Sequence, residues 1–311
     1  MSVSTKISVV IPCYNEEEVL PHLLNELICV AKTIPGVEFE YIFVDDGSDD
    51  KTLSVLRRLA RENSQINYLS FSRNFGKESA LLAGLEAATG DYLAIMDADL
   101  QDPPGLLPEM YLSITTQGYD CVATRRISRK GEPAIRSFFA SSFYKFVNTI
   151  SETKVVDGAR DFRLMTRQMV DAILALKEYN RFSKGLFNWV GFNTSWIEYE
   201  NLSRAAGTTK WKFGQLFSYS MDGITAFSIK PLALASFAGV VLCFIAFVAV
   251  IFIMVRRILF GDPVAGWAST VVIVLFVGGI QLLCNGIMGL YLSRVYLEVK
   301  GRPAYIIKER S

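Results

Sequence analysis

The chain has 311 residues, of which 51% are hydrophobic and 20% are charged, with 32 Lys and Arg against 31 Asp and Glu. This length and apolar content suffice for a packed core and exclude a disordered chain. The net charge of +1 argues against nucleic acid as a partner, because nucleic-acid-binding proteins usually carry a basic excess.

The first 130 or so residues alternate between apolar runs and helical patterns. The apolar runs predict strands at Ile7–Ile11, Tyr41–Val44, Ile66–Phe71, Tyr92–Met96 and Cys121–Thr124. The patterns between them predict helices at Glu16–Thr33, Lys51–Glu62, Glu78–Thr89 and Leu106–Gln117. This alternation indicates an α/β fold with a mostly parallel sheet covered on both faces.

Cysteine and histidine usage limits the chemistry. The cysteines are odd in number, widely spaced and without a C-x-x-C pair, which argues against disulfides and zinc and favours a reducing compartment: Cys13, Cys29, Cys121, Cys243 and Cys284. The one histidine, His22, follows Pro21 at the start of a helical pattern, where a surface or capping position is expected. Histidine-centred catalysis is therefore nearly excluded.

A polar, acid-rich turn follows each of the first four predicted strands. These turns are Pro12–Glu17, Asp45–Asp50, Ser72–Lys77 and Asp97–Pro104. Each alone could be a solvated turn with helix-capping acids. Because the carboxyl ends of parallel strands meet at one edge of a sheet, we expect the four turns to form a ligand site there. Neither G-x-G-x-x-G nor G-x-x-x-x-G-K-[ST] occurs, so the common dinucleotide and P-loop motifs are absent from the sequence.

Asp97 and Asp99 are the most specific element of these turns. They lie two residues apart directly after a predicted strand, so in an extended chain both side chains point to the same face. Two converging carboxylates suit a hard cation such as Mg²⁺ or Mn²⁺, which completes its shell with phosphate oxygens and water. The pair therefore predicts a metal that holds a nucleotide diphosphate.

Two uncharged stretches near the C-terminus predict transmembrane helices. They are residues 231–255 and 267–293, and at about 1.5 Å per residue each can cross a hydrocarbon core of roughly 30 Å. The linker contains Gly261-Asp262-Pro263, a turn signal, so a helical hairpin is expected. Two buried core helices would be the alternative.

The flanking charges predict the orientation of this hairpin. Only Arg256 and Arg257 lie in the linker, whereas eight basic residues flank the outer ends: Lys210, Lys212, Lys230, Arg294, Lys300, Arg302, Lys308 and Arg310. The positive-inside rule places the N-terminal domain and the C-terminal tail in the cytoplasm, at the inner membrane. Residues 211–230 mix aromatic residues and lysines as an interfacial helix would. Gln281 and Asn285, one turn apart on the second span, favour self-association.

The motifs together resemble those of glycosyltransferase family 2, the inverting enzymes of GT-A fold. P-C-Y-N-E, V-D-D-G-S and D-A-D-L-Q-D-P-P carry this resemblance, and D-G-A-R-D-F-R-L, R-F-S-K-G and S-R-A-A-G-T-T-K-W sharpen it to the polyprenyl-phosphate glycosyltransferases. The layout is similar to that of bacterial bactoprenol glucosyltransferases and dolichol-phosphate mannose synthases. It implies a catalytic domain at 1–210, an interfacial helix at 211–230, spans at 231–255 and 267–293, and a tail at 294–311.

The resemblance also implies roles for individual residues. It assigns the nucleoside pocket to Pro12, Tyr14, Glu16, Asp45, Asp46, Arg73 and Lys77, with a carboxylate of the Asp45/Asp46 pair facing the base. It makes Asp97 a nucleotide or metal contact, Asp99 the principal metal ligand and Gln101 a third ligand. It puts phosphate or acceptor contacts at Arg125, Arg136, Arg204 and Lys210. Asp157 is the candidate for orienting the acceptor or taking a proton, with Asp161 as its rival and a plain turn aspartate as the alternative.

The reaction implied is transfer of a hexose, with glucose from UDP-glucose as the first expectation, to undecaprenyl phosphate with Mg²⁺ or Mn²⁺. A homo-oligomer is expected, a tetramer being one candidate size. Mannose or an amino sugar is the alternative donor group. A processive polysaccharide synthase is disfavoured because no Q-x-x-R-W occurs. A non-catalytic, membrane-anchored nucleotide-binding protein is the alternative from another class.

Overall fold

The computed structural model describes residues 5–126, 156, 158–199, 230–260 and 266–311. Four predicted site residues lie outside the described residues: Arg136, Asp157, Arg204 and Lys210. The same holds for residues 211–229 of the predicted interfacial helix and for the predicted turn at 261–263.

The described residues form an eight-stranded sheet with the order β7-β5-β6-β4-β1-β2-β3-β8. The strands are β1 (Thr5–Cys13), β2 (Val37–Asp45), β3 (Ile66–Phe71), β4 (Tyr92–Ile95), β5 (Cys121–Arg126), β6 (Ala159–Thr166), β7 (Thr194–Tyr199) and β8 (Ile307–Arg310). Only β6 and β8 run against the other described strands. The prediction of a mostly parallel α/β sheet is thus confirmed.

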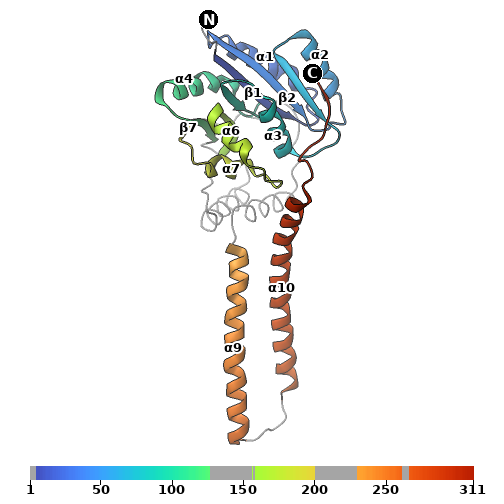
Figure 1. Ribbon diagram of the computed structural model, residues 1–311, viewed down its shortest axis with the longest axis vertical. Coiled ribbons are helices and arrows are strands. Elements are labelled where there is room, and N and C mark those ends of the chain that lie inside the picture. Colours follow the sequence, from blue (N-terminus) through green and yellow to red (C-terminus); the bar gives the residue numbers. More distant parts are fainter. Residues whose placement is uncertain (1–4, 127–155, 157, 200–229, 261–265) are drawn as a thin grey trace.

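Helices cover both faces of this sheet (Figure 1). They are α1 (Leu20–Ala31), α2 (Thr52–Glu62), α3 (Lys77–Ala87), the short 3-10 helix η1 (Pro104–Leu106), α4 (Leu107–Gln117), α6 (Arg167–Ala175) and α7 (Ser183–Trp189). Because side chains alternate along a strand, Val9 and Ile11 pack into the core with α1, α2 and α4, whereas Val10 packs into the core with α3, α6 and α7. Burial on both faces explains why these strands read as continuous apolar runs.

The five strands predicted in the N-terminal half are all present, and the helices differ mainly at their ends. The first helix begins at Leu20 rather than Glu16, because residues 17–19 form a turn in which the Glu16 carbonyl accepts hydrogen bonds from Val19 and Leu20. Pro21 then occupies the first turn of α1, where a missing N–H costs nothing. His22 is exposed there, in agreement with the predicted surface position.

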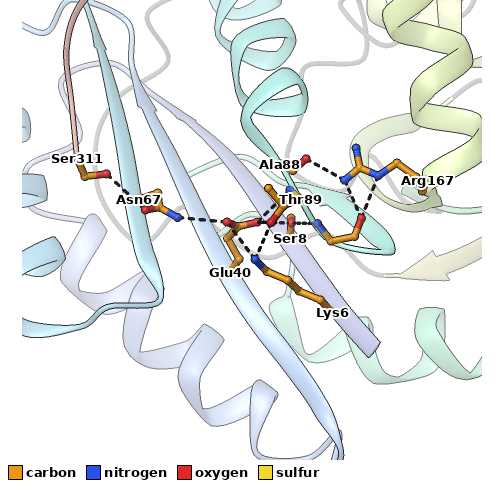
Figure 2. A network of polar contacts seen from close by, with 9 residues as sticks. Lys6, Ser8, Glu40, Asn67, Ala88, Thr89, Arg167 and Ser311 are labelled. Atoms are coloured by element: carbon orange, nitrogen blue, oxygen red, sulfur yellow. Dashed lines mark hydrogen bonds and ion pairs between the residues drawn. The ribbon is translucent and has the colours of Figure 1, made fainter. Parts of the chain in front are cut away.

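A buried polar network joins β1, β2 and the α3–β4 connection (Figure 2). Glu40 accepts hydrogen bonds from Ser8 at 2.6 Å and from the Thr89 hydroxyl at 3.1 Å, and it pairs with Lys6 at 3.3 Å. Burial alone would raise the pKa of Glu40, but these partners outweigh burial and lower it. The Ser8 hydroxyl also accepts the N–H of Gly90 at 2.8 Å. The network fixes the start of β4 against β1.

Two long helices, α9 (Lys230–Phe260) and α10 (Trp267–Lys300), project away from the sheet domain (Figure 1). Both are long and apolar enough to cross a membrane, with mean hydropathy 2.6 over Leu232–Ala249 and 1.4 over Phe276–Lys300. Their large apolar side chains are exposed, for example Phe244 at 68% and Leu282 at 73%. A soluble protein rarely leaves such a continuous apolar surface uncovered. Both helices extend beyond the uncharged stretches at 231–255 and 267–293, into the adjoining charged residues.

The predicted tail at 294–311 is not a free tail. Its first part completes α10, which ends at Lys300, and Gly301 follows in the left-handed conformation with φ +59°. The chain then returns to the sheet, and β8 pairs antiparallel with β3. The polar sequence Ile307-Lys308-Glu309-Arg310 gives no alternating pattern, so the prediction could not identify this strand.

Candidate active site

The polar turns that follow β1 and β2 interlock at the carboxyl edge of the sheet. The Asn15 N–H donates to the Ser48 hydroxyl at 2.9 Å, and the Asp49 N–H donates to the Asn15 side-chain oxygen at 2.9 Å. The Glu16 N–H donates to the Thr52 hydroxyl at 2.9 Å. The expected gathering of these turns at one edge is therefore present.

Asp45 and Asp46 are buried, with 1% and 4% of their surface exposed. Asp45 accepts from the Ser48 N–H at 3.0 Å and from the Ser70 hydroxyl at 2.7 Å. Asp46 accepts from the Phe75 N–H at 2.7 Å and the Gly76 N–H at 2.9 Å. Burial raises the pKa of Asp46 despite those two hydrogen bonds. Both carboxylates thus hold the turns of their own chain, and the contact of one of them with a base remains a prediction.

The turns after β2 and β3 touch at Gly47. Its φ is +67°, a conformation that glycine adopts without strain, and a Cβ there would lie 2.3 Å from the carbonyl carbon of Arg73. Arg73 is exposed on the second of these turns, with its guanidinium 4.0 Å from the ring centre of Phe75. Close packing against the Arg73 backbone therefore explains why the V-D-D-G-S motif has a glycine at this position.

The Asp97–Asp99 segment is a turn rather than an extension of the strand. β4 ends at Ile95, residues 98–99 form a turn, and Leu100 has a left-handed φ of +56°. The extended geometry expected through Asp99 is therefore wrong. Burial and then the nearby Asp97 charge raise the pKa of Asp99. The Gln101 N–H donates to Asp99 at 3.1 Å and holds the turn.

Lys77 joins Asp97 to Asp161 of β6. Its ammonium lies 2.5 Å from Asp97 Oδ1 and also pairs with Asp161. Desolvation opposes the charge of Lys77, but the two carboxylates outweigh it and raise the pKa of the lysine. Burial would raise the pKa of Asp161, yet the charges of Lys77 and then of Lys184 lower it. The N-terminal residue of α3 thus neutralises two acids at the edge of the sheet.

Gln101 faces a second buried charge cluster that the sequence did not predict. Its side-chain oxygen accepts from Arg160 at 3.1 Å, so in this structure the amide is engaged by an arginine. Arg160 also binds Asp102 at 2.9 Å, and Asp102, 1% exposed, receives the Tyr199 hydroxyl. The sequence does contain one signal for this cluster: the charged residues Asp102 and Arg160 lie within the motifs D-A-D-L-Q-D-P-P and D-G-A-R-D-F-R-L. These residues brace the turn that carries Asp99.

The other predicted residues lie around this edge. Pro12 is the penultimate residue of β1 and is half-buried, and Tyr14 is 36% exposed just after the strand. Arg125 lies near the end of β5, beside Ala159 of β6, and donates to Glu198 of β7 at 2.8 Å. The described predicted residues are thus brought to one edge of the sheet, while Arg125 is paired with a neighbouring acid.

A further contact ties α7 to this edge. Glu78, at the start of α3, accepts from the Ser183 N–H at 2.9 Å and from the Ser183 hydroxyl. Burial raises the pKa of Glu78 in spite of these bonds. Arg163 of β6, 2% exposed, has its guanidinium 3.7 Å from the ring centre of Phe187 on α7. The R-F-S-K-G motif is therefore docked beside Lys77.

The carboxylate oxygens at this edge suit a hard divalent cation for which the protein supplies only some of the ligands. Among the residues that the structure describes, no three His, Cys, Asp or Glu side chains form a cluster that could hold a metal ion. Asp97 and Asp99 offer carboxylate oxygens, which suit Mg²⁺ or Mn²⁺ when ligand phosphate oxygens and water supply the remaining positions. Lys77 is a competing cation at Asp97.

Comparisons with known proteins show which family the chain resembles. The model of glycosyl transferase family 2 matches residues 8–174. The chain is 45% identical to the putative glycosyltransferase CsbB of Bacillus subtilis (strain 168), over 97% of this chain and 91% of that protein. It is 40% identical to the bactoprenol glucosyl transferase of Shigella phage SfX, over 98% of this chain and 99% of that protein. Mannosyl-3-phosphoglycerate synthase from Rubrobacter xylanophilus is similar in structure, with 18% identity and a TM-score of 0.48 over 71% of this chain and 72% of that one.

Proposed function

Because the chain belongs to glycosyltransferase family 2, we propose that it transfers a hexose from a nucleotide sugar to a polyprenyl phosphate, with glucose, UDP-glucose and undecaprenyl phosphate as the specific choices. The observation that carries the proposal is the 40% identity to a bactoprenol glucosyl transferase over 98% of this chain, the two apolar helices included. Configuration at the anomeric carbon inverts because the acceptor attacks opposite the departing diphosphate.

The donor binds at the carboxyl edge of the sheet. Tyr14 and Arg73 are exposed there for contact with the nucleoside and the diphosphate. Asp97 and Asp99 would hold the divalent cation, which when bound would stabilise the negative charge that develops on the departing diphosphate. The buried Asp102–Arg160 pair keeps the Asp99 turn in place beneath it.

The acceptor needs little activation. A phosphate monoester has a second pKa near 6, so at pH 7 it is largely a dianion and a competent nucleophile. Asp161 is committed to Lys77 and its pKa is lowered, which makes it a weak proton acceptor. Asp157 is therefore preferred for orienting the acceptor. Arg136, Arg204 and Lys210 are proposed to bind phosphate, and all four residues lie outside the described part of the chain.

The lipid tail of the acceptor lies in the membrane that α9 and α10 cross. The site faces the cytoplasm, where nucleotide sugars are available, and the basic residues around the outer ends of the helices favour this side. Self-association through Gln281 and Asn285 of α10 is part of the proposal, and a tetramer is one candidate size.

The test is sugar transfer by the purified full-length protein in detergent with Mg²⁺ and undecaprenyl phosphate. A panel of UDP- and GDP-sugars is supplied, and the lipid extract is measured by mass spectrometry. We expect a hexosyl-phospholipid from UDP-glucose; a product from a mannose or amino-sugar donor instead would replace the sugar but keep the reaction. No product from any donor would refute the proposal.

Asp99→Asn provides the active-site variant for this assay. Loss of a metal-binding carboxylate should lower turnover by about 100-fold or more, in line with the removal of one group that stabilises transition-state charge. The matched control is Asp171→Asn on α6, because the Asp171 side chain is 61% exposed and lies 3.7 Å from Arg167 of the same helix. Equal turnover in the two variants would discredit the metal assignment.

A further inference from the structure

The segment that follows α10 packs against the turn expected to bind the donor. β8 pairs with β3, with Phe71 opposite Ile307. Beyond the strand, the Ser72 N–H donates to the Ile306 carbonyl at 3.0 Å. The Ser79 hydroxyl donates to the Ala304 carbonyl at 3.0 Å. Residues 304–306 therefore contact Ser72, at the start of the turn at 72–76 that we call the β3–α3 turn, and Ser79, in the first turn of α3.

Tyr305 is the centre of this contact. Its ring stacks on Phe71 with ring centres 5.0 Å apart and an interplanar angle of 14°. Phe71 in turn meets Phe75 edge to face, with ring centres 5.7 Å apart. The Tyr305 hydroxyl donates to Glu86 on α3. Three rings thus form a continuous support from the C-terminal segment to the β3–α3 turn.

The supported turn carries groups of the candidate site. The Phe75 N–H donates to the buried Asp46 at 2.7 Å, and the Arg73 guanidinium lies over the Phe75 ring. Lys77 follows directly and reaches Asp97. A shift of the Phe75 ring would therefore move the turn from which Arg73 and Lys77 reach the site.

We propose that Tyr305 is a positioning residue for donor binding: its ring, stacked on Phe71, holds the β3–α3 turn in the conformation that presents Arg73 to the nucleotide diphosphate and places Lys77 against Asp97. This inference rests on the proposed function, since it names the turn that binds the donor. It also links the end of the second apolar helix to the nucleotide site, because only Gly301 to Ala304 separate α10 from Tyr305 (Figure 1).

The experiment compares three variants of the full-length protein in detergent. Tyr305→Leu removes the ring, and Tyr305→Phe keeps the ring but loses the hydroxyl. Glu309→Gln is the matched control, because Glu309 belongs to the same C-terminal segment but binds Arg57 of α2 at 2.5 Å and Tyr68 of β3 at 2.6 Å. UDP and GDP are the binding probes in titration calorimetry, and hydrogen exchange follows the Phe75 and Gly76 amides.

For Tyr305→Leu we expect nucleotide affinity to fall by roughly three- to tenfold, the range of one lost aromatic pair. The Phe75 and Gly76 amides should exchange faster. Tyr305→Phe should restore both readouts to near wild-type values. Glu309→Gln should lower the melting temperature while nucleotide affinity stays at the wild-type value. The KM for the sugar donor should rise in Tyr305→Leu without a change in the KM for the lipid.

Wild-type affinity in Tyr305→Leu would overturn the inference, and so would an equal loss of affinity in Glu309→Gln, since the segment would then act only through general stability. If the wild-type protein binds neither UDP nor GDP, the proposed function fails instead. In that case the exchange of the Phe75 amide alone decides the inference: unchanged exchange in Tyr305→Leu refutes the positioning role.

Discussion

Lys77 balances the charge of two acids that come from different parts of the chain. Asp97 follows β4, and Asp161 belongs to β6, which enters the sheet between β4 and β5. A sequence reading can assign Lys77 to a ligand pocket but cannot find its partners, because Asp161 is 84 residues away along the chain. The lysine therefore has a structural role beside any role in binding.

Lys77→Met should lower the free energy of unfolding by about 1–3 kcal/mol. This is less than the roughly 3–5 kcal/mol lost when a fully buried pair is broken, because the Lys77 side chain is 41% exposed and solvent screens the pair. Chemical denaturation of the full-length protein in detergent measures the change. Lys51→Met, at an exposed lysine before α2, is the control and should have little effect.

The stability lost in Lys77→Met should depend on pH. The pKa of Asp161 is lowered in the folded protein, so its ionised form contributes stability above the ordinary aspartate value of about 4. That contribution is lost as the pH falls through the lower folded-state value. The difference in melting temperature between wild type and variant should therefore be largest near neutral pH and should shrink toward acid pH. A difference that stays constant from neutral pH down to about pH 2 would contradict the pairing, because the contribution of Asp161 is lost below its ordinary pKa.

At the scale of elements, the α3–β4 connection depends on close backbone contact. A Cβ at Gly90 would lie 2.7 Å from the Ser8 nitrogen and 2.8 Å from the Lys6 carbonyl oxygen, and neither backbone atom can move without disturbing β1. Gly90→Ala should therefore lower the free energy of unfolding by about 1–3 kcal/mol through overpacking. Gly105→Ala is the control, since nothing lies within 4 Å of its added Cβ. Equal melting temperatures for the two variants would refute the steric argument.

The elements that could be predicted from sequence are those with local signals. β1 to β5 carry buried apolar runs, and the helices between them have apolar faces, so both were found. β6 was not predicted because Arg160, Asp161 and Arg163 interrupt its apolar residues, and their partners lie on other elements. β8 is a polar strand stabilised by pairing with β3 and by the Arg57–Glu309 ion pair. Such non-local partners leave no pattern in a single sequence.

In the candidate site too, local motifs could be predicted from the sequence, whereas contacts between distant residues could not. The motifs placed Asp97, Asp99, Arg73 and Lys77 at one edge of the sheet, which the structure bears out. The sequence could not reveal that the Asp45 and Asp46 carboxylates are occupied by hydroxyl and amide donors of their own chain. Those hydrogen bonds depend on how the β2 and β3 turns pack at Gly47.

At the scale of the whole molecule, pairing of β8 with β3 constrains how the chain can cross a membrane. β3 precedes α9 and β8 follows α10, yet both strands belong to one sheet. A sheet lies on one side of a bilayer, so the chain must return to its starting side after α10. Two crossings satisfy this condition, and it supports the hairpin independently of the flanking basic residues.

This topology predicts opposite accessibility for two positions of the full-length protein. Cys29, exposed on α1, reports on the sheet domain, and Asp262→Cys reports on the linker between the two helices. In a background where the other cysteines are replaced, an impermeant maleimide added to intact spheroplasts should label position 262 only. Cys29 should react only after permeabilisation, because the proposed orientation puts the sheet domain in the cytoplasm. Labelling of both positions from the same side would contradict a two-helix hairpin, since the helices would then not cross the membrane.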